Sequence, residues 1–420
     1  MNAPRRRTVL TDLVAADAAI PFDPTTPEQR EHPFDVLSLA RREQPVFHAP
    51  ALDLWVVTRH DDVLTVLKDH RTFSSAGALR SSSVALPNHV LDVLAEGCPE
   101  MPYIIELDPP LHDRIRGLVA RAFTPRRIDE LGPRVEAIAS ELIDELKPRG
   151  RADIVEAFAW PLPLRVLGEL FGFPREDLEQ IHRWGIDWLL LQQQRPLDEQ
   201  LGHAAGLVEL QRYCVAAVEH RRTEPTDDLL GAMVRANDDA DAPLGTVEIA
   251  GLPLDLMVAG HVTVTRAIGS TLNRMFSEPA LREHLLDPEL WPKAIEEILR
   301  LESPAQGLFR VTTKEVELGG AVLPEGARVM AHFASANRDA CVFADADEYR
   351  PQREDIGSHL AFGKGIHFCI GAPLGRLELR VALPMLLRRL PGLRPGTGTP
   401  MREAVFFARG FTSLEVEWDR

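Results

Sequence analysis

The sequence predicts a mainly α-helical protein with a small β-rich part. Apolar residues recur at three- and four-residue spacing between charged ones, the pattern of helices that bury one face. This pattern is clearest in three segments, residues 129–148, 205–221 and 292–301. Strand-like runs are short and lie in three places, residues 54–58, residues 309–333 and the tail from Val405. Because strands from both ends of the chain flank a helical middle without a linker-like stretch, we expect residues 1–420 to form a single domain.

A central helix and a series of hairpins are the clearest individual elements. Residues 254–272 have the profile of a buried helix, since residues 256–265 include no Asp, Glu, Lys or Arg. Residues 316–330 alternate between apolar and polar side chains and are interrupted at Gly319-Gly320 and at Pro324-Glu325-Gly326, which is typical of hairpins. Residues 391–400 form a turn-rich connector.

Charge and composition exclude several classes of protein. The chain carries 47 Lys and Arg against 63 Asp and Glu, a formal net charge of −16, so it lacks the basic footprint of a nucleic-acid binder. No uncharged apolar stretch approaches the roughly 18 residues of a transmembrane helix. Arg5, Arg6 and Arg7 are followed by no apolar core of a secretory signal. We therefore expect a cytoplasmic protein that binds neither nucleic acid nor membrane, and we expect a monomer.

The four cysteines are widely and irregularly spaced. Cys98, Cys214, Cys341 and Cys369 include no C-x-x-C pair, which disfavours both a disulfide framework and a structural zinc site. For the first three, we expect buried side chains that act as small hydrophobes.

Cys369 differs from the others because a motif surrounds it. Residues 362–371 read Phe-Gly-Lys-Gly-Ile-His-Phe-Cys-Ile-Gly. The two spaced glycines allow a tight turn near a flat ligand, and the residues after Gly371 look like a helix start with Pro373 in the first turn. A cysteine at a helix N-terminus is favoured as the thiolate, the metal-binding form. A lone thiolate suits a metal that brings its own equatorial ligands, and haem iron is the obvious case. The competing interpretation is a loop with an inert buried cysteine.

These ten residues resemble the haem-binding loop of the cytochrome P450 family, F-x-x-G-x-(H/R)-x-C-x-G, at each fixed position. The resemblance spans essentially the whole chain, from the strand around Trp55 to the last strands. It implies a cytochrome P450 fold in which haem b lies between the central helix and the cysteine loop. It also implies that Cys369 is the axial iron ligand, that Phe362 shields the sulfur, and that His367 contacts a haem propionate. Gly371 is the last fixed residue of the motif.

Glu297 and Arg300 lie three residues apart on one predicted helix face. Alone, such a pair is weak, because most are solvated and contribute only tenths of a kcal/mol. Its position before Cys369 matches the core Glu–Arg pair of the cytochrome P450 family. The family completes this pair with a second arginine, but Glu348 stands where that arginine is usual. Either Arg350 or Arg353 takes the role.

Further candidates for propionate binding come from two other segments. His112 and Arg116 are four residues apart and share a helix face. Buried propionates need cationic or hydrogen-bonding partners. The stretch from Asp108 to Arg116 matches the family pattern D-P-P-x-H-x-x-x-R in full. Arg310 fits a further propionate contact, with a cross-strand surface charge as the alternative.

The middle of the central helix carries the candidate catalytic residues Ala259, Gly260 and Thr263. Small residues let a helix pass close to a flat cofactor, and a mid-helix threonine can bond back to a carbonyl. In the family the pattern is (A/G)-G-x-(D/E)-T, and its acid and threonine supply protons during dioxygen activation. Val262 stands in the place of the acid. His261 lies roughly 100° round the helix and is no simple substitute, and Thr265 faces elsewhere.

Val262 leaves two reactions open. Water and substrate groups can deliver protons to Thr263, which leaves monooxygenation intact. Alternatively, the product arises by radical coupling or ring closure, with a C–C or C–N bond formed and no oxygen inserted. Two non-catalytic alternatives are a haem-thiolate binding or sensing protein and a reactive thiol at Cys369 without haem.

The substrate and the electron donor are expected to be separate molecules. The substrate is a medium-sized, partly apolar organic molecule of natural-product type. Candidate lining residues are Val258, Ala259, Gln306, Leu308 and Phe406, with Gln192 and Gln193 as possible polar contacts. Because no redox domain is fused to the haem domain, electrons come from a ferredoxin-type or flavodoxin-like partner. A basic patch near Cys369 would steer such an acidic carrier. Its candidate members are Arg114, Arg121, Lys364 and Arg376.

Overall fold

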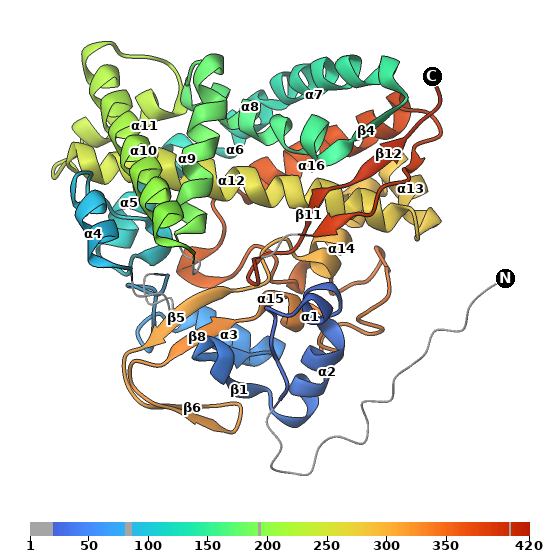
Figure 1. Ribbon diagram of the computed structural model, residues 1–420, viewed down its shortest axis with the longest axis horizontal. Coiled ribbons are helices and arrows are strands. Elements are labelled where there is room, and N and C mark those ends of the chain that lie inside the picture. Colours follow the sequence, from blue (N-terminus) through green and yellow to red (C-terminus); the bar gives the residue numbers. More distant parts are fainter. Residues whose placement is uncertain (1–19, 80–85, 192–194, 403–404) are drawn as a thin grey trace.

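The computed structural model describes residues 20–79, 86–191, 195–402 and 405–420. Most helices form a large upper layer, and a smaller β-rich layer with the N-terminal helices lies below it (Figure 1). The α-helices are α1 (Pro27–Glu31), α2 (Phe34–Glu43), α3 (His60–Lys68), α4 (Asn88–Ala95), α5 (Leu111–Ala122), α6 (Pro125–Glu130), α7 (Gly132–Leu146), α8 (Pro161–Phe171), α9 (Leu178–Leu190), α10 (Leu197–Thr223), α11 (Leu229–Asp238), α12 (Thr246–Met275), α13 (Pro279–Leu286), α14 (Trp291–Glu302), α15 (Phe333–Ala336) and α16 (Ala372–Arg389). The mainly α prediction is confirmed.

The strands are short and form four small sheets. They are β1 (Val46–Ala49), β2 (Leu54–Val57), β3 (Phe73–Ser74), β4 (Arg151–Asp153), β5 (Leu308–Thr312), β6 (Val316–Leu318), β7 (Ala321–Leu323), β8 (Arg328–Ala331), β9 (Arg394–Pro395), β10 (Met401–Arg402), β11 (Phe411–Ser413) and β12 (Glu415–Glu417). The largest sheet has the order β1-β2-β8-β5-β3, in which only β2 and β8 run parallel. The predicted hairpin series is confirmed at its first turn, because β6 and β7 pair around Gly319 and Gly320. It is wrong at the second turn, because β8 pairs with β2 and β5 and not with β7.

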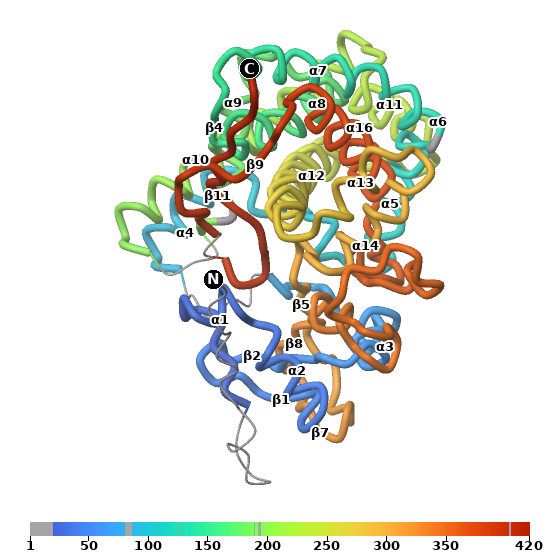
Figure 2. The backbone as a smooth tube through the Cα atoms, turned by 90° about the vertical axis from the view of Figure 1, so that its right-hand side faces the viewer, coloured from blue at the N-terminus to red at the C-terminus, as the bar shows by residue number. Residues whose placement is uncertain are grey.

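Helix α12 forms the centre of the helical layer, and α8, α10, α14 and α16 pack against it (Figure 2). Most of its side chains are buried, including those of Leu254, Ile268 and Leu272. By length and composition alone it could cross a membrane, but 67% of its most apolar window is buried inside the protein. Such burial is typical of a core helix.

Three predicted features differ in detail. The predicted helix over residues 129–148 is divided into α6 and α7, since Pro133 has no N–H to continue the hydrogen-bond ladder. The connector over residues 391–400 contains the short strand β9. Cys214 is buried as predicted, but Cys341 is exposed, so it does not act as a core hydrophobe.

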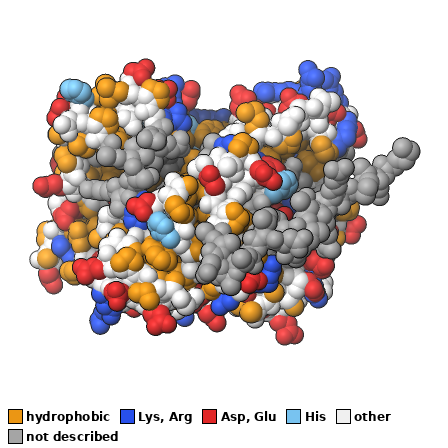
Figure 3. Space-filling model, turned by 60° about the horizontal axis from the view of Figure 1, so that its bottom comes forward, with side chains coloured by type: hydrophobic (Ala, Val, Ile, Leu, Met, Phe, Trp, Pro, Cys, Tyr) orange, Lys and Arg blue, Asp and Glu red, His pale blue; other side chains and the backbone are white. Residues whose placement is uncertain are grey.

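On the face drawn in Figure 3, acidic side chains are scattered among basic ones rather than gathered in one place.

Candidate active site

A cavity of about 400 Å³, hereafter the central cavity, is lined by α12 and by the loop that carries Cys369. Its wall is mainly apolar. Of the predicted substrate contacts, Val258, Ala259, Leu308 and Phe406 line it. Thr263 and Cys369 line the same cavity, together with residues of α5, α8 and α16. The structure therefore brings segments from most of the chain to one apolar space.

The cysteine loop has the geometry that its glycines allow. Gly363 and Gly365 have φ angles of 67° and 74°, a region that other residues rarely adopt. A Cβ atom on Gly365 would collide with the carbonyl oxygen of Leu67, so no larger residue fits there. The N–H of Cys369 donates to the carbonyl of Phe362 across 2.9 Å, which closes the loop. Helix α16 then begins at Ala372.

Burial and the neighbouring groups act on the charge state of Cys369 in opposite directions. Burial raises the pKa of the Cys369 thiol, although the amides of Gly371 and Ala372 and the guanidinium groups of Arg116 and Arg376 act in the opposite direction. The helix N-terminus therefore does not by itself produce a thiolate, because desolvation is the larger effect. A metal cation at the sulfur would supply the missing charge.

Four basic side chains gather beside the cavity, as predicted from three separate motifs. Arg116 and His367 line the cavity, and the rings of His112 and His367 lie 4.4 Å apart. Burial, with help from Arg310, His112 and Arg116, lowers the pKa of His367 to about 3. Burial likewise lowers the pKa of Arg310 to about 10, and its side chain is 2% exposed. The Nε2 atom of buried His112 has no hydrogen-bond partner among the described residues.

This cluster fits the propionates of a haem. His112 and Arg310 are buried, Arg116 and His367 are half-buried and line the cavity, and the carboxylates near the cluster are Asp113 on Nδ1 of His112 and Asp108 near Arg310. Propionates would offer acceptors to the unpartnered nitrogen of His112 and negative charge to Arg116 and Arg310. The Nε2 atom of His367 already lies 3.0 Å from the hydroxyl oxygen of Ser75, so a propionate would bind this nitrogen alongside that hydroxyl. Together with a cysteine sulfur on the cavity wall, the donor set matches a haem bound through a thiolate.

On α12, the hydroxyl of Thr263 donates to the carbonyl of Ala259 across 2.8 Å, and Thr263 lines the cavity. Val262 lines it as well, so the position expected for an acid is occupied by an apolar side chain. The hydroxyl of buried Thr265 bonds to the carbonyl of His261 instead. Thr263 is thus the hydroxyl that this stretch of α12 presents to the cavity.

His261 is turned away from the cavity. Its Nε2 lies 2.9 Å from the carbonyl of Trp160, and its ring packs edge-on against Trp160 and His182. Burial lowers the pKa of His261 to about 3. As predicted from its angle around the helix, His261 does not replace the missing acid.

The Glu297–Arg300 pair is buried and has a third member. Both side chains are 0% exposed, and Nε of Arg300 donates to Glu297 across 2.8 Å. Nε of Arg353 donates to the same carboxylate across 3.0 Å. Arg350 contributes only its backbone N–H, while its side chain pairs with Asp345. Arg353 therefore completes the triad that the sequence left open.

Comparisons with known proteins agree on one family. A family model described as cytochrome P450 matches residues 287–406. Mycinamicin IV hydroxylase/epoxidase of Micromonospora griseorubida is 38% identical over 94% of this chain and 100% of its own length. 6-Deoxyerythronolide B hydroxylase of Saccharopolyspora erythraea is 37% identical over 82% of this chain and 84% of its own. The structure of CYP109Q5 from Chondromyces apiculatus has a TM-score of 0.84 and 34% identity, covering 94% of this chain and 98% of that one.

The chain belongs to the cytochrome P450 family. It has the P450 fold, and its relatives are named hydroxylases and monooxygenases. This P450 is therefore an oxidoreductase of the haem monooxygenase class, and its cofactor is haem held by a cysteine thiolate.

Of the predicted cavity residues of this P450, Gln306 is placed elsewhere, and the small size of Gly260 has a different cause from the one predicted. Gln306 does not line the central cavity, because its amide donates to the carbonyl of Ser303 across 2.6 Å within the core. Gly260 lines the cavity with its backbone, but a Cβ there would lie 3.2 Å from Leu167 of α8. Its small size serves the packing of two helices. Residues 192–193, the possible polar contacts, lie outside the described residues.

Sequence reasoning missed two buried carboxyl groups on the cavity wall, Asp255 and Glu378. Burial raises the pKa of each well above its usual value. The N–H of Ile104 donates to Asp255 across 2.5 Å, whereas one oxygen of Glu378 has no partner in the described chain. A signal for Asp255 existed, because it is the single acid beside the uncharged run of residues 256–265.

Proposed function

We propose that this P450 inserts one oxygen atom into a mainly apolar natural product, of the size and character of a macrocyclic lactone, as part of secondary metabolism. The observation that carries this proposal is the central cavity, which joins a cysteine sulfur and an anion-binding cluster to an apolar space beside Thr263. Relatives named for the hydroxylation of mycinamicin IV and 6-deoxyerythronolide B support the substrate class. The chain acts as one haem-binding domain.

The proposed haem contacts divide into a ligand and anchors. Cys369 is the axial ligand, and the ring of Phe362, which lines the cavity beside it, limits access of water to the sulfur. The anchors of the propionates are His112, Arg116, Arg310 and His367. Bound haem supplies dioxygen activation and one-electron chemistry, while the protein supplies binding, orientation and protons.

The substrate lies against the apolar wall formed by Val258, Ala259, Leu308 and Phe406. The protein can hold a proton near the reacting carbon at the hydroxyl oxygen of Thr263. Water and substrate hydroxyl groups relay protons to that oxygen, because Val262 cannot titrate. The raised pKa of Asp255 favours the protonated carboxyl, which can donate a hydrogen bond to a polar group of the substrate.

A second candidate reaction is radical coupling or ring closure without oxygen insertion, and Val262 on the cavity wall is the observation that favours it. Turnover under isotopically labelled dioxygen separates the two reactions. One labelled oxygen atom per product molecule is expected for monooxygenation. A product that has lost hydrogen and carries no label would show that coupling is the reaction.

Replacing Thr263 with alanine is expected to lower the amount of product formed per electron pair by about tenfold to a hundredfold. The change removes the hydroxyl that α12 presents to the cavity at this point. Thr265→Ala is the matched control, because its hydroxyl is buried and turned to His261. The measurement compares product with reductant consumed. Equal losses in both variants would contradict the role given to Thr263.

Replacing Asp255 with asparagine is expected to change both substrate affinity and the pH dependence of stability. The folded-state pKa of Asp255 is raised, chiefly by burial. Its contribution is therefore most favourable below the unfolded pKa and is lost as the pH rises through the folded pKa. The melting temperature of the wild type should fall relative to that of Asp255→Asn as the pH rises above the ordinary aspartate pKa of about 4. Exposed Asp92→Asn serves as the control, and parallel curves for all three proteins would contradict the assignment.

Electrons are proposed to come from a separate ferredoxin-type partner that approaches the face near Cys369. Arg114 and Arg121 of α5 are exposed and remain candidates, as does half-buried Lys364. Arg376 is a weaker one than the sequence predicted, because it forms a bidentate pair with Glu296, with distances of 2.6 and 2.8 Å. A monomer in the cytoplasm remains the proposed state of this P450.

A further inference from the structure

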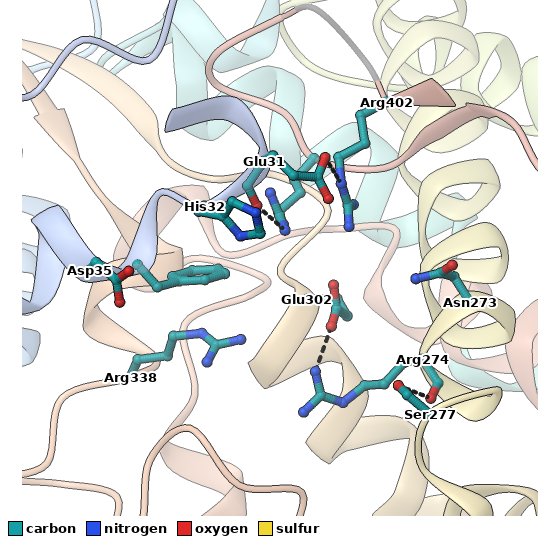
Figure 4. A pocket seen from close by; sticks show the side chains of 11 residues that line it. Glu31, His32, Asp35, Asn273, Arg274, Ser277, Glu302, Arg338 and Arg402 are labelled. Carbon is teal, nitrogen blue, oxygen red and sulfur yellow. Dashed lines mark hydrogen bonds and ion pairs between the residues drawn. The ribbon is translucent and has the colours of Figure 1, made fainter. Parts of the chain in front are cut away.

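A second cavity, hereafter the arginine cavity, has a volume of about 310 Å³ and shares no lining residue with the central cavity. It lies where α1 and α2 meet the C-terminal ends of α12 and α14, with Arg402 of β10, Arg409 before β11 and Arg338 after α15 completing its wall. Its size is at the lower end of small-molecule sites, which span about 300–1,000 Å³. Four arginines line it, Arg274, Arg338, Arg402 and Arg409. Figure 4 shows the first three directing their guanidinium groups toward a common space that also contains Glu302.

The arginines of this cavity hold more N–H donors than the protein satisfies. Arg274 donates to Glu302 across 2.9 Å, and Arg402 donates to Glu31 across 2.7 Å. Each of the four arginines nevertheless keeps one buried nitrogen without a hydrogen-bond partner among the described residues. Buried polar groups normally have partners, and an exception points to a bound water or ion. The excess of donors indicates a ligand that accepts hydrogen bonds.

The charges of the cavity point the same way. Arg338 and Arg409 are 6% and 9% exposed. Burial is the largest cause that lowers the pKa of both. Repulsion from neighbouring guanidinium groups adds to it, while Glu302 and Asp347 oppose it for Arg338, and Glu302 and Glu31 oppose it for Arg409. An anion placed among them would offset both the desolvation and this repulsion. Guanidinium groups present several N–H groups in one plane, a geometry that suits phosphate and carboxylate oxygens.

The carboxylates of the cavity restrict which anion fits. Glu31 and Glu302 each accept from an arginine, and Asp35 also lines the cavity, so the oxygens of these three carboxylates would repel a fully ionised ligand. A hydrogen phosphate group avoids this repulsion, because its P–OH can donate to a carboxylate while its other oxygens accept from the arginines. Sulfate has no proton to donate at neutral pH. We infer that the arginine cavity is a binding site for a phosphate group, carried either by the free ion or by a small phosphate monoester.

Calorimetric titration of the phosphate-free holoenzyme tests this site with three probes: inorganic phosphate, glycerol 2-phosphate and sulfate. We expect phosphate to bind at one site per chain, and sulfate at least about tenfold more weakly. Glycerol 2-phosphate that binds as tightly as phosphate would assign the site to a monoester, whereas binding of phosphate alone would assign it to the free ion. Absence of phosphate binding, or sulfate bound as tightly as phosphate, would overturn the proposal.

Two variants locate the site. Arg402→Gln should weaken phosphate binding at least about tenfold, whereas Arg126→Gln, on an arginine whose side chain is 90% exposed, should leave it unchanged. Glu302→Gln should narrow the difference in affinity between phosphate and sulfate, because it removes a negative charge that disfavours sulfate. The spectrum of thiolate-ligated haem shows whether each variant has folded. If Arg402→Gln does not fold, the phosphate-to-sulfate selectivity of Glu302→Gln still tests whether this cavity is the site. Unchanged affinity in Arg402→Gln, or unchanged selectivity in Glu302→Gln, would overturn the assignment to this cavity.

Discussion

Replacing Cys369 with alanine is expected to abolish the monooxygenase activity of this P450 and to remove the spectral signature of thiolate-ligated haem. The sulfur of Cys369 lies on the wall of the central cavity, and among the described lining residues it is the only cysteine. Thiolate ligation donates electron density that favours cleavage of the O–O bond, and no neighbouring side chain can replace it. The activity should fall to background.

The measurement is the spectrum of the reduced carbon monoxide complex, with haem content determined separately. The propionate anchors His112, Arg116 and Arg310 are untouched by the change, so haem can remain bound while the thiolate band is lost. Cys341→Ala is the matched control, because Cys341 is exposed and lies outside the cavity. A thiolate band that persists in Cys369→Ala, or disappears equally in Cys341→Ala, would refute the assignment of the ligand.

The sequence predicted best those features that lie within one short segment. The loop of residues 362–371 contains its glycines, histidine and cysteine in fixed order, so its turn and the following helix could be predicted from local sequence alone. The same holds for the Glu297–Arg300 pair, which one helical turn places on one face. Position along a helix also predicted correctly that His261 does not take the place of the acid and that Thr265 faces away from the side of Thr263.

Features that depend on the packing of distant segments could not be predicted in this way. The choice between Arg350 and Arg353 depends on which side chain the loop turns toward Glu297. Gln306 was placed in the cavity because it precedes β5, but local hydrogen bonds hold its amide in the core. The arginine cavity gathers side chains from both ends of the chain, between residues 31 and 409, and no local pattern indicates it. The effect of burial on Cys369, which raises the pKa of its thiol, also could not be estimated from a motif.

Replacing Arg353 with alanine is expected to lower the free energy of unfolding by about 1.5–3 kcal/mol, the range for hydrogen bonds to charged groups, whereas Arg350→Ala should change it by less than about 1 kcal/mol. Arg353 is a buried partner of Glu297, and its side chain is 5% exposed. Its guanidinium also donates to the carbonyls of Ala344 and Asp345, so it fixes the chain before the cysteine loop. The side chain of Arg350 is 50% exposed and pairs on the surface with Asp345.

Denaturant unfolding of the two variants, followed by the loss of the thiolate band, measures the difference. Arg300 would still neutralise Glu297 in Arg353→Ala through two contacts of 2.8 Å, so the loss reports the third member of the triad and not an unpaired carboxylate. Glu297→Gln provides the complementary test, because it leaves Arg300 and Arg353 buried without a counter-ion and should destabilise at least as much as Arg353→Ala. Equal stability of Arg350→Ala and Arg353→Ala would contradict the assignment of Arg353, because the two arginines would then exchange roles in solution. The loop before the cysteine segment would in that case be held by the backbone N–H of Arg350 and by the contacts of Arg300 alone.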